Sequence, residues 1–204
     1  MSRYTGAVTR LSRRLGTMLF TNTGSKLKAF QKKGYKPGQH GQKRFSQISE
    51  YNKHLQEKQK ARFMYGVSEK QFSNYFKVAV KSDEATGVRF MKLLEQRLDN
   101  VVFRAGIGST RPQARQLVAH GLITLNGKKA SVPSIQVKVG DKFEISGKKK
   151  SSKLFENIEK RAFKPAKWIR ANIKTLSGEV IALPDKDDIE QAIDNQLITE
   201  FYSK

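Results

Sequence analysis

The stretch TRPQARQLVAHGLITLNGKKA, residues 110–130, decides the fold class of this chain. Thr110 can cap a helix, and Pro112 is tolerated in the first helical turn because the backbone N–H that it lacks would be unpaired there anyway. Gly121 is expected to end this helix. Asn126-Gly127 lies between two short segments that can form strands, and this dipeptide is the strongest short-range signal for a β-hairpin. The stretch therefore predicts a short helix that leads into two antiparallel strands.

The residues that follow predict a small antiparallel sheet. Apolar and polar residues alternate over residues 135–139 and again over residues 143–145, with a turn at Gly140-Asp141. Residues 169–173 and 179–183 have the composition of further strands. Together these segments predict a helix–turn–helix-like unit on a small antiparallel sheet, with lysines at the hairpin tip.

Three amphipathic helices are predicted upstream of this sheet, over residues 49–65, 68–80 and 86–98. Ser49 and Ser68 are residue types that cap helices, so each is expected at the start of its helix. Short links between the three helices predict a small helical domain.

The first of these helices carries different side chains on its faces. Ile48, Tyr51 and Leu55 mark one face. Lys58 and Arg62 lie four residues apart, so they are expected to project together from one side of the helix.

The fold class that follows is α+β. Two further helices are expected over residues 152–162 and from Asp185 to about Asp194, the latter with its acids at the end that the helix dipole favours. The predicted domains are a basic arm (1–44), a helical domain (45–94) joined by the C-terminal segment (185–204), and an α/β RNA-binding module (95–184).

The arm is expected to be irregular. Glycines interrupt any hydrophobic pattern in residues 1–46, so at most one helical turn is predicted, near residues 11–15. A cationic, glycine-bearing segment of this kind is expected to be ordered by its partner. Tyr4, Phe20 and Tyr35 are interleaved with the cations, and rings among phosphate-seeking cations are typical of a nucleic-acid surface.

The charge of the chain points to a polyanion as its partner. The 204 residues carry 40 Lys and Arg against 18 Asp and Glu, a net charge of +22. Residues 1–62 hold 15 Lys and Arg and 2 acids, and residues 111–150 hold 9 and 2. The segments between and after these two regions are close to neutral, so two separate basic regions are available to bind nucleic acid.

Several classes of protein and chemistry are excluded or disfavoured. No run approaches the roughly 18 apolar residues of a spanning helix, and the N-terminus lacks the apolar core of a signal peptide, so we expect a cytoplasmic protein without a membrane partner. The chain has no cysteine, and His40, His54 and His120 lack metal-ligand spacing. No phosphate loop or catalytic set is present, so no metal, no cofactor and no enzymatic activity are expected.

Eight blocks of the sequence resemble the bacterial type of the small-subunit ribosomal protein four family, in its cysteine-free form. The blocks are RYTG at 3–6, LSRRLG at 11–16, PGQHG at 37–41, SEY at 49–51, EKQKAR at 57–62 with MYGV at 64–67, RLDNVVFR at 97–104, ARQLV at 114–118 and ITEFYSK at 198–204. They extend over nearly the whole chain. Some relatives bind zinc through four cysteines in the arm, which this chain cannot do.

The resemblance implies a primary binder of small-subunit ribosomal RNA (rRNA). It implies that the protein binds the five-way junction of the 5′ domain and nucleates assembly of the subunit. It also implies contact with ribosomal protein five, an influence on decoding accuracy, and cations beside the channel through which mRNA enters, where Lys43 and Arg44 are the candidates.

Charge patterning and the resemblance together give the candidate site residues. The candidate RNA-binding residues are Arg3, Tyr4, Arg10, Arg13, Arg14, Lys36, Gln39, His40, Lys43, Arg44, Tyr51, Lys58, Lys60, Arg62, Arg104, Arg111, Gln113, Arg115, Lys128 and Lys129. The candidate contacts to a protein partner are Asp185, Asp187, Asp188 and Glu190. Acids of this kind would repel phosphate and suit a basic protein.

Alternatives remain at this stage. Arg111 and Arg115 can either bind phosphate or cover the apolar stripe of their own helix with their aliphatic stems. For the chain as a whole, the alternatives are an RNA-modifying enzyme with an appended binding module and a nonspecific DNA binder. Two folded modules favour a shaped RNA target, so DNA is not expected as the partner.

Overall fold

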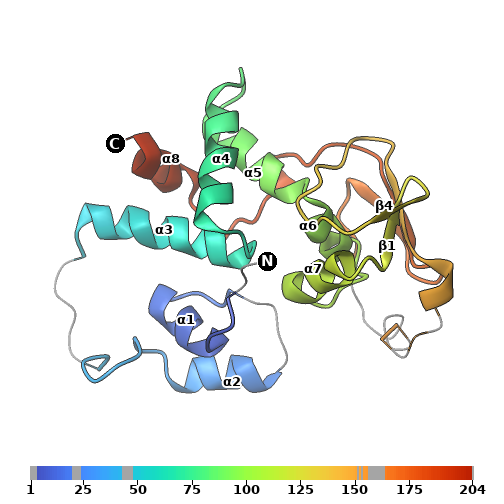
Figure 1. The fold of residues 1–204 in the computed structure, drawn as a ribbon. Coiled ribbons are helices and arrows are strands. Elements are labelled where there is room, and N and C mark those ends of the chain that lie inside the picture. The colour runs from blue at the N-terminus through green and yellow to red at the C-terminus, as the bar shows by residue number, and fades with distance from the viewer. Residues whose placement is uncertain are drawn as a thin grey trace. The chain divides into compact units, whose positions relative to one another are not determined.

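A computed structural model describes residues 4–19, 24–42, 48–150, 152, 154–155 and 164–203 (Figure 1). The α-helices of these residues are α1 Val8–Leu15, α2 Gly24–Lys32, α3 Glu50–Met64, α4 Glu69–Val80, α5 Thr86–Glu95, α6 Leu98–Arg104, α7 Arg111–Ala119 and α8 Asn195–Ser203. The strands are β1 Ile123–Leu125, β2 Lys128–Ala130, β3 Lys142–Ile145, β4 Ile169–Asn172 and β5 Ser177–Val180. Two short 3₁₀-helices are η1 Gly147–Lys149 and η2 Lys186–Asp188.

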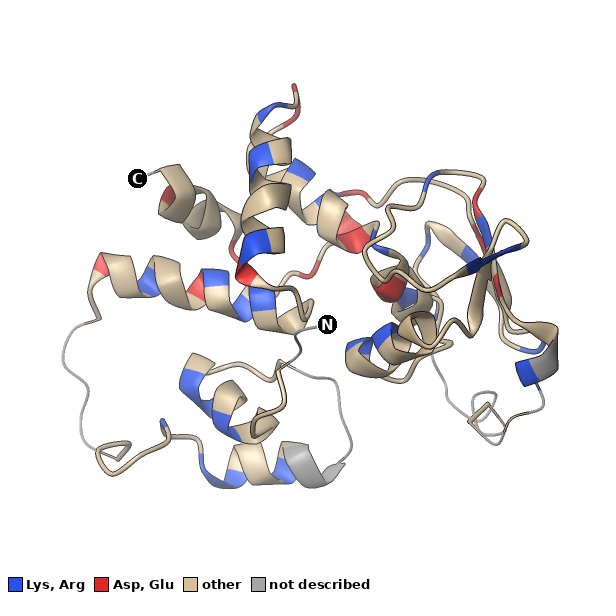
Figure 2. Ribbon diagram, in the orientation of Figure 1, with Lys and Arg blue, Asp and Glu red and all other residues tan. Residues whose placement is uncertain are grey.

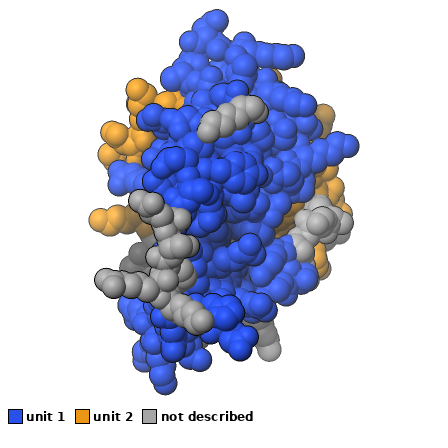
Figure 3. Space-filling view, turned by 90° about the vertical axis from the view of Figure 1, so that its left-hand side faces the viewer, with its two compact units in different colours: residues 1–87, 191–204 blue, residues 88–190 orange. Residues whose placement is uncertain are grey.

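The chain divides into two compact units, coloured separately in Figure 3. Unit 1 comprises Met1–Gly87 and Gln191–Lys204, and unit 2 comprises Val88–Glu190. The domain boundaries expected from the sequence, after residues 44, 94 and 184, stay a prediction, because compactness alone does not show which part folds independently.

Unit 2 contains a five-stranded antiparallel sheet with the strand order β2-β1-β3-β5-β4. The hairpin between β1 and β2 turns at Asn126 and Gly127, whose φ angles are 50° and 78°. Positive φ at both central residues is what a type I′ turn requires, and asparagine and glycine adopt it most readily. The predicted hairpin and the α+β fold class are confirmed.

Helix α7 also has the predicted boundaries. The Thr110 side chain accepts a hydrogen bond from the Gln113 N–H at 3.2 Å and so caps the first turn. At the other end Gly121 has a φ of 65°, and the Leu122 N–H donates to the Leu117 carbonyl, which closes the helix. Buried Ala114, Leu117 and Val118 face a core that also contains Trp168 and Phe143. This core anchors the helix to the sheet.

In unit 1 helices α3, α4 and α8 surround a second core. Ser49 and Ser68 cap α3 and α4 as predicted, each accepting a backbone N–H at 3.4 Å. Helix α8 packs against α3, and Tyr202 of α8 stacks on Phe76 of α4 with ring centroids 4.7 Å apart. The C-terminal residues therefore complete the helical unit.

Two expectations near residue 97 were wrong for one common reason. The third predicted helix ends at Glu95 rather than at Leu98, and residues 135–139 form a single bridge, between Gln136 and Arg97, instead of a strand. The Leu98 N–H donates to the Ile135 carbonyl, and the Val137 N–H donates to the Gln96 carbonyl. Residues 135–139 therefore form their backbone hydrogen bonds with the link between α5 and α6, and not with a neighbouring strand.

The predicted helix at residues 185–194 was also wrong. Only η2 forms there, and the α-helix begins at Asn195. The Asp194 carboxylate accepts the N–H groups of Gln196 and Leu197, so Asp194 stands at the start of a helix instead of its end. The strand expected at 179–183 runs from Ser177 to Val180.

The remaining differences concern the arm and α3. The arm is not irregular throughout, because it contains α1 and α2, with Leu11 and Leu19 buried. In α3 the buried side chains are His54, Lys58, Ala61 and Met64, whereas Tyr51 is 60% exposed. The helix predicted at 152–162 lies largely outside the described residues. No helix among the described residues is long and apolar enough to cross a membrane.

Candidate RNA-binding surface

The helices of the arm contain cations and no acidic residue. The first acid of the chain is Glu50, and α1 and α2 are accordingly marked only by Lys and Arg in Figure 2. Arg10 and Arg14 are exposed on α1. Arg13 is half-buried: its Nε donates to the Tyr35 carbonyl at 3.0 Å, and its guanidinium lies 4.8 Å from the centroid of the Tyr35 ring.

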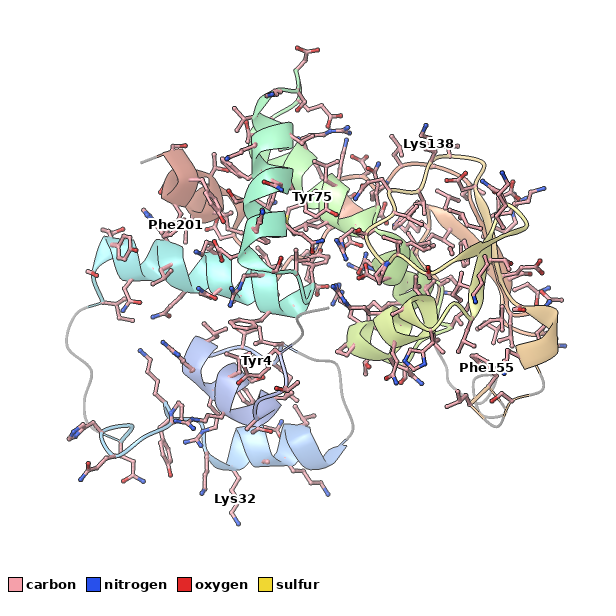
Figure 4. The ribbon with its side chains drawn as sticks, in the orientation of Figure 1. Tyr4, Lys32, Tyr75, Lys138, Phe155 and Phe201 are labelled. Carbon is pink, nitrogen blue, oxygen red and sulfur yellow. The ribbon has the colours of Figure 1, made fainter. Side chains whose placement is uncertain are left out.

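The other candidates of the arm lie in different surroundings. The Tyr4 ring meets the Phe63 ring edge-on, with centroids 5.3 Å apart, and lies between α1 and α3 in Figure 4. Gln39 and His40 are exposed, and Lys36 is half-buried. Three further candidates lie outside the described residues: Arg3, Lys43 and Arg44.

The cations of α3 are engaged inside unit 1. Lys58 Nζ lies 2.8 Å from Glu69 Oε1, and only 8% of the Lys58 side chain is exposed. Arg62 reaches the same carboxylate at 3.4 Å, so Lys58 and Arg62 do lie on one side of the helix. Lys60 Nζ donates to Glu57 at 2.6 Å and to the Ala192 carbonyl at 3.0 Å. RNA binding by these three cations stays a prediction.

Glu69 is the acceptor at the centre of this cluster. Burial alone would raise the pKa of Glu69, but hydrogen bonds from Lys58 and Tyr202 and the positive charges of Lys58 and Arg62 outweigh it and lower the pKa below 4.5. The hydrogen bond from Tyr202 to Glu69 also affects Tyr202, because burial and this hydrogen bond raise the pKa of the Tyr202 hydroxyl. Glu69 therefore stabilises the folded state in its charged form.

Replacing Glu69 by glutamine is expected to lower the melting temperature at neutral pH by roughly 2–4 °C, because Lys58 and Arg62 lose a charged acceptor. Since the folded-state pKa is depressed, this contribution is present above pH 4.5 and is lost as the pH falls through the lowered value. Circular dichroism melts of the wild type and the variant should therefore converge in acid. Exposed Asp83→Asn is the control, and an equal difference at both pH values would contradict the assignment.

The arginines of unit 2 surround a pair of buried carboxylates. Arg97 donates two hydrogen bonds to the Asp99 carboxylate, from Nε at 3.0 Å and from Nη2 at 2.7 Å. The Arg97 side chain has no exposed area. Arg115 Nη1, from α7, reaches the same carboxylate at 3.1 Å. Asp99 thus fixes the side chain of one candidate RNA-binding arginine to the start of α6.

Glu95 likewise fixes two other candidate RNA-binding arginines, Arg104 and Arg111. Its fully buried carboxylate accepts two hydrogen bonds from Arg104, at 2.9 and 2.7 Å, and one from Asn100 at 2.6 Å. The Asn100 side-chain oxygen in turn accepts from Arg111 Nε at 2.9 Å. The Arg111 guanidinium also lies 4.7 Å from the centroid of the Phe103 ring.

This arrangement presents three guanidinium groups in fixed positions. The exposed fractions of the Arg104, Arg111 and Arg115 side chains are 21%, 11% and 15%, so each reaches the surface while most of it is packed. Side chains that are already ordered lose less conformational entropy when they bind a phosphate. The structure shows the guanidinium groups of Arg111 and Arg115 paired with Asn100, Glu190 and Asp99, and phosphate binding by these two arginines stays a prediction.

The other candidates of unit 2 lie at its surface. The Gln113 side-chain oxygen accepts the Ser109 N–H at 2.8 Å, so this side chain supports the first turn of α7. Lys128 and Lys129 are exposed on β2, directly after the hairpin turn. Their exposed amino groups suit contact with phosphate.

The acidic candidates separate into two groups. Asp185 and Asp187 are exposed, and the half-buried Asp188 accepts the Asp185 N–H at 3.2 Å. Glu190 instead lies 2.8 Å from Arg111 Nη2 and 3.4 Å from Arg104 Nη2. Glu190 was expected to meet a protein partner, and the structure places it on two candidate RNA-binding arginines of its own chain.

Sequence reasoning missed the residues that hold the arginines. Glu95, Asp99 and Asn100 were not among the candidates, although acids within the apolar run FMKLLEQRLDNVVF at 90–103 are a usable signal, because buried charges are rarely unpaired. It also missed a groove of about 1110 Å³ on the sheet, to which Lys142, Arg170 and Lys174 contribute. Across the part of the chain that the structure describes, no group of three His, Cys, Asp or Glu residues could hold a metal ion.

Comparisons with known proteins show which family the chain is similar to. The family described as "Ribosomal protein S4/S9 N-terminal domain" matches residues 3–95, and the family described as "S4 domain" matches residues 96–143. The chain is 48% identical over 210 residues to small ribosomal subunit protein uS4 of Acetivibrio thermocellus. The identity is 46% to the protein of that name from Heliobacterium modesticaldum and 45% to that from Limosilactobacillus reuteri. Each alignment covers the whole of both chains.

Proposed function

The chain belongs to the uS4 family of ribosomal proteins, and from this premise we propose how it binds its RNA. It is a structural constituent of the small ribosomal subunit that binds small-subunit rRNA, and it is not an enzyme. The alternative of an RNA-modifying enzyme is thereby set aside. The observation that carries the proposal is the set of three guanidinium groups on α6 and α7 that buried carboxylates hold in place.

The mechanism is a clamp with two cationic faces. One face is supplied by the arm and α3, the other by α7 and the β1–β2 hairpin. The grooves of A-form RNA hide most base identity, so both faces recognise the shape of folded RNA through phosphate and sugar contacts. The proposed target is the five-way junction of the 5′ domain, which the protein binds before other components and so nucleates assembly.

The proposed protein partner is ribosomal protein five. Exposed Asp185 and Asp187 and the half-buried Asp188 support this contact, because they suit a basic surface and repel RNA. Contact between the two proteins is the proposed route by which this chain influences decoding accuracy. Lys43 and Arg44 are proposed to lie beside the path of incoming mRNA, and the proposed location is the cytoplasm.

Primary binding is tested without any other ribosomal protein. The wild-type chain should retain a transcript of the 5′ domain on a filter, and disruption of the five-way junction by strand deletion should weaken binding on the order of a thousandfold, the lower bound of the range that separates specific from nonspecific binding. Equal retention of the intact and the disrupted transcripts would refute recognition of the junction.

A further inference from the structure

Glu190 differs from the other carboxylates that contact the arginines of unit 2. Glu95 and Asp99 have exposed side-chain fractions of 0% and 5%, and each accepts several hydrogen bonds from the residues around it. Glu190 is 28% exposed and contacts the guanidinium groups of Arg104 and Arg111. The two buried carboxylates are parts of the core, whereas Glu190, which shares Arg104 and Arg111 with Glu95, is partly exposed.

The Glu190 carboxylate occupies a position that is suited to a phosphate. Its Oε2 accepts from Arg111 Nη2 at 2.8 Å and lies 3.4 Å from Arg104 Nη2, so one oxygen is shared by two guanidinium groups. Carboxylate and phosphate oxygens bind guanidinium groups with the same geometry and chemistry. An RNA phosphate at this position and the Glu190 side chain would exclude each other.

The position of Glu190 in the chain also allows its side chain to move away from Arg104 and Arg111. Glu190 is the last residue of unit 2, and the chain continues at Gln191 into unit 1. The segment before it contains the three-residue helix η2, exposed or half-buried acids and the buried Ile189, so the backbone beside Glu190 is anchored while its side chain is 28% exposed. Displacement of Glu190 therefore needs only a rotation of its side chain and leaves the backbone of this segment in place.

We propose that Glu190 is an internal phosphate mimic: it occupies an RNA-phosphate position on Arg104 and Arg111 and is displaced when rRNA binds. This inference rests on the proposed function, since it assumes that RNA binds this face of unit 2. Together with Glu95, the Glu190 carboxylate offsets the positive charges of the two guanidinium groups in the free protein. Because Glu190 occupies the two arginines, it competes with weakly bound anions. Only a ligand that makes further contacts with the protein displaces it, so binding favours an RNA of complementary shape over a random RNA.

The test is the affinity of Glu190→Gln for the 5′-domain transcript at constant salt. Removing the competing charge should tighten binding about fivefold, which corresponds to an ion pair worth roughly 1 kcal/mol. Glu179→Gln is the matched control, because it makes the same charge change at a half-buried residue of unit 2, on β5. The fluorescence of Trp168, the single tryptophan, verifies that unit 2 of each variant is folded.

The outcomes separate this inference from the function on which it rests. Unchanged or weaker binding by Glu190→Gln would overturn displacement, because a residue that only positions the arginines would weaken binding when removed. An equal gain in Glu179→Gln would also overturn it, since net charge alone would then explain the effect. In an Arg104→Gln/Arg111→Gln background the gain from Glu190→Gln should vanish. Failure of the wild type to prefer the 5′-domain transcript over random duplex would instead refute the proposed function.

Discussion

Replacing Asp99 by asparagine should lower the free energy of unfolding of unit 2 by about 3–5 kcal/mol, because the fully buried Arg97 guanidinium loses the carboxylate that accepts two of its hydrogen bonds. Arg97 has no exposed side-chain area, and Asp99 also holds Arg115 and the Asn100 N–H. Urea unfolding followed by Trp168 fluorescence measures this loss, since the single tryptophan lies in the core of unit 2.

Two further variants make the Asp99 result specific. Glu144→Gln removes an exposed carboxylate that pairs with Lys150 at 3.4 Å, and it should cost under about 1 kcal/mol. Arg97→Met combined with Asp99→Leu should be less destabilising than Asp99→Asn, because the fully buried charge of Arg97 is removed together with its carboxylate. A loss for Asp99→Asn as small as that for Glu144→Gln would show that this ion pair does not hold the module together.

The Arg111→Gln/Arg115→Gln variant should bind the 5′-domain transcript on the order of a hundredfold more weakly at constant salt, because two charge-assisted hydrogen bonds to phosphate are lost. The logarithm of affinity should also depend less steeply on the logarithm of salt concentration, by roughly 1.4–1.8 for two phosphate contacts. The fold should survive for two reasons. Asp99 still pairs with Arg97, and Glu190, which loses Arg111, is 28% exposed and can be hydrated.

The control for this variant changes the same charge elsewhere in unit 2. Arg170→Gln/Lys174→Gln removes two cations from the groove on the sheet. It should leave the affinity within about threefold of the wild type if net charge acts only through weak, screened attraction. Equal losses in both double variants would mean that α7 contributes no more than general charge.

Local signals in the sequence predicted the elements that depend on local chemistry. Thr110, Gly121 and Asn126-Gly127 fix the ends of α7 and the hairpin turn through backbone conformation and capping, which need no distant partner. Ser49 and Ser68 were correctly placed at the starts of α3 and α4 for the same reason. Most of the sheet and the α+β class followed from these elements.

The rest depended on contacts between distant residues. Lys58 is buried because Glu69 and the ring of Phe201 meet it, and periodicity within α3 could not show either partner. Residues 135–139 alternate like a strand, yet their backbone partners are residues 96–98. The pairing of Arg104 and Arg111 with Glu190 likewise joins segments that are far apart in the sequence.

The central claim is that this chain recognises a folded rRNA by shape and not by charge alone. The most direct measurement is competition at constant salt, in which the labelled 5′-domain transcript is displaced by unlabelled transcript or by random-sequence duplex of equal length. The account predicts that the duplex competes at least about a thousandfold less well, the lower bound for a specific nucleic-acid complex. Equal competition by the two RNAs would contradict the account and would make the chain a nonspecific polyanion binder.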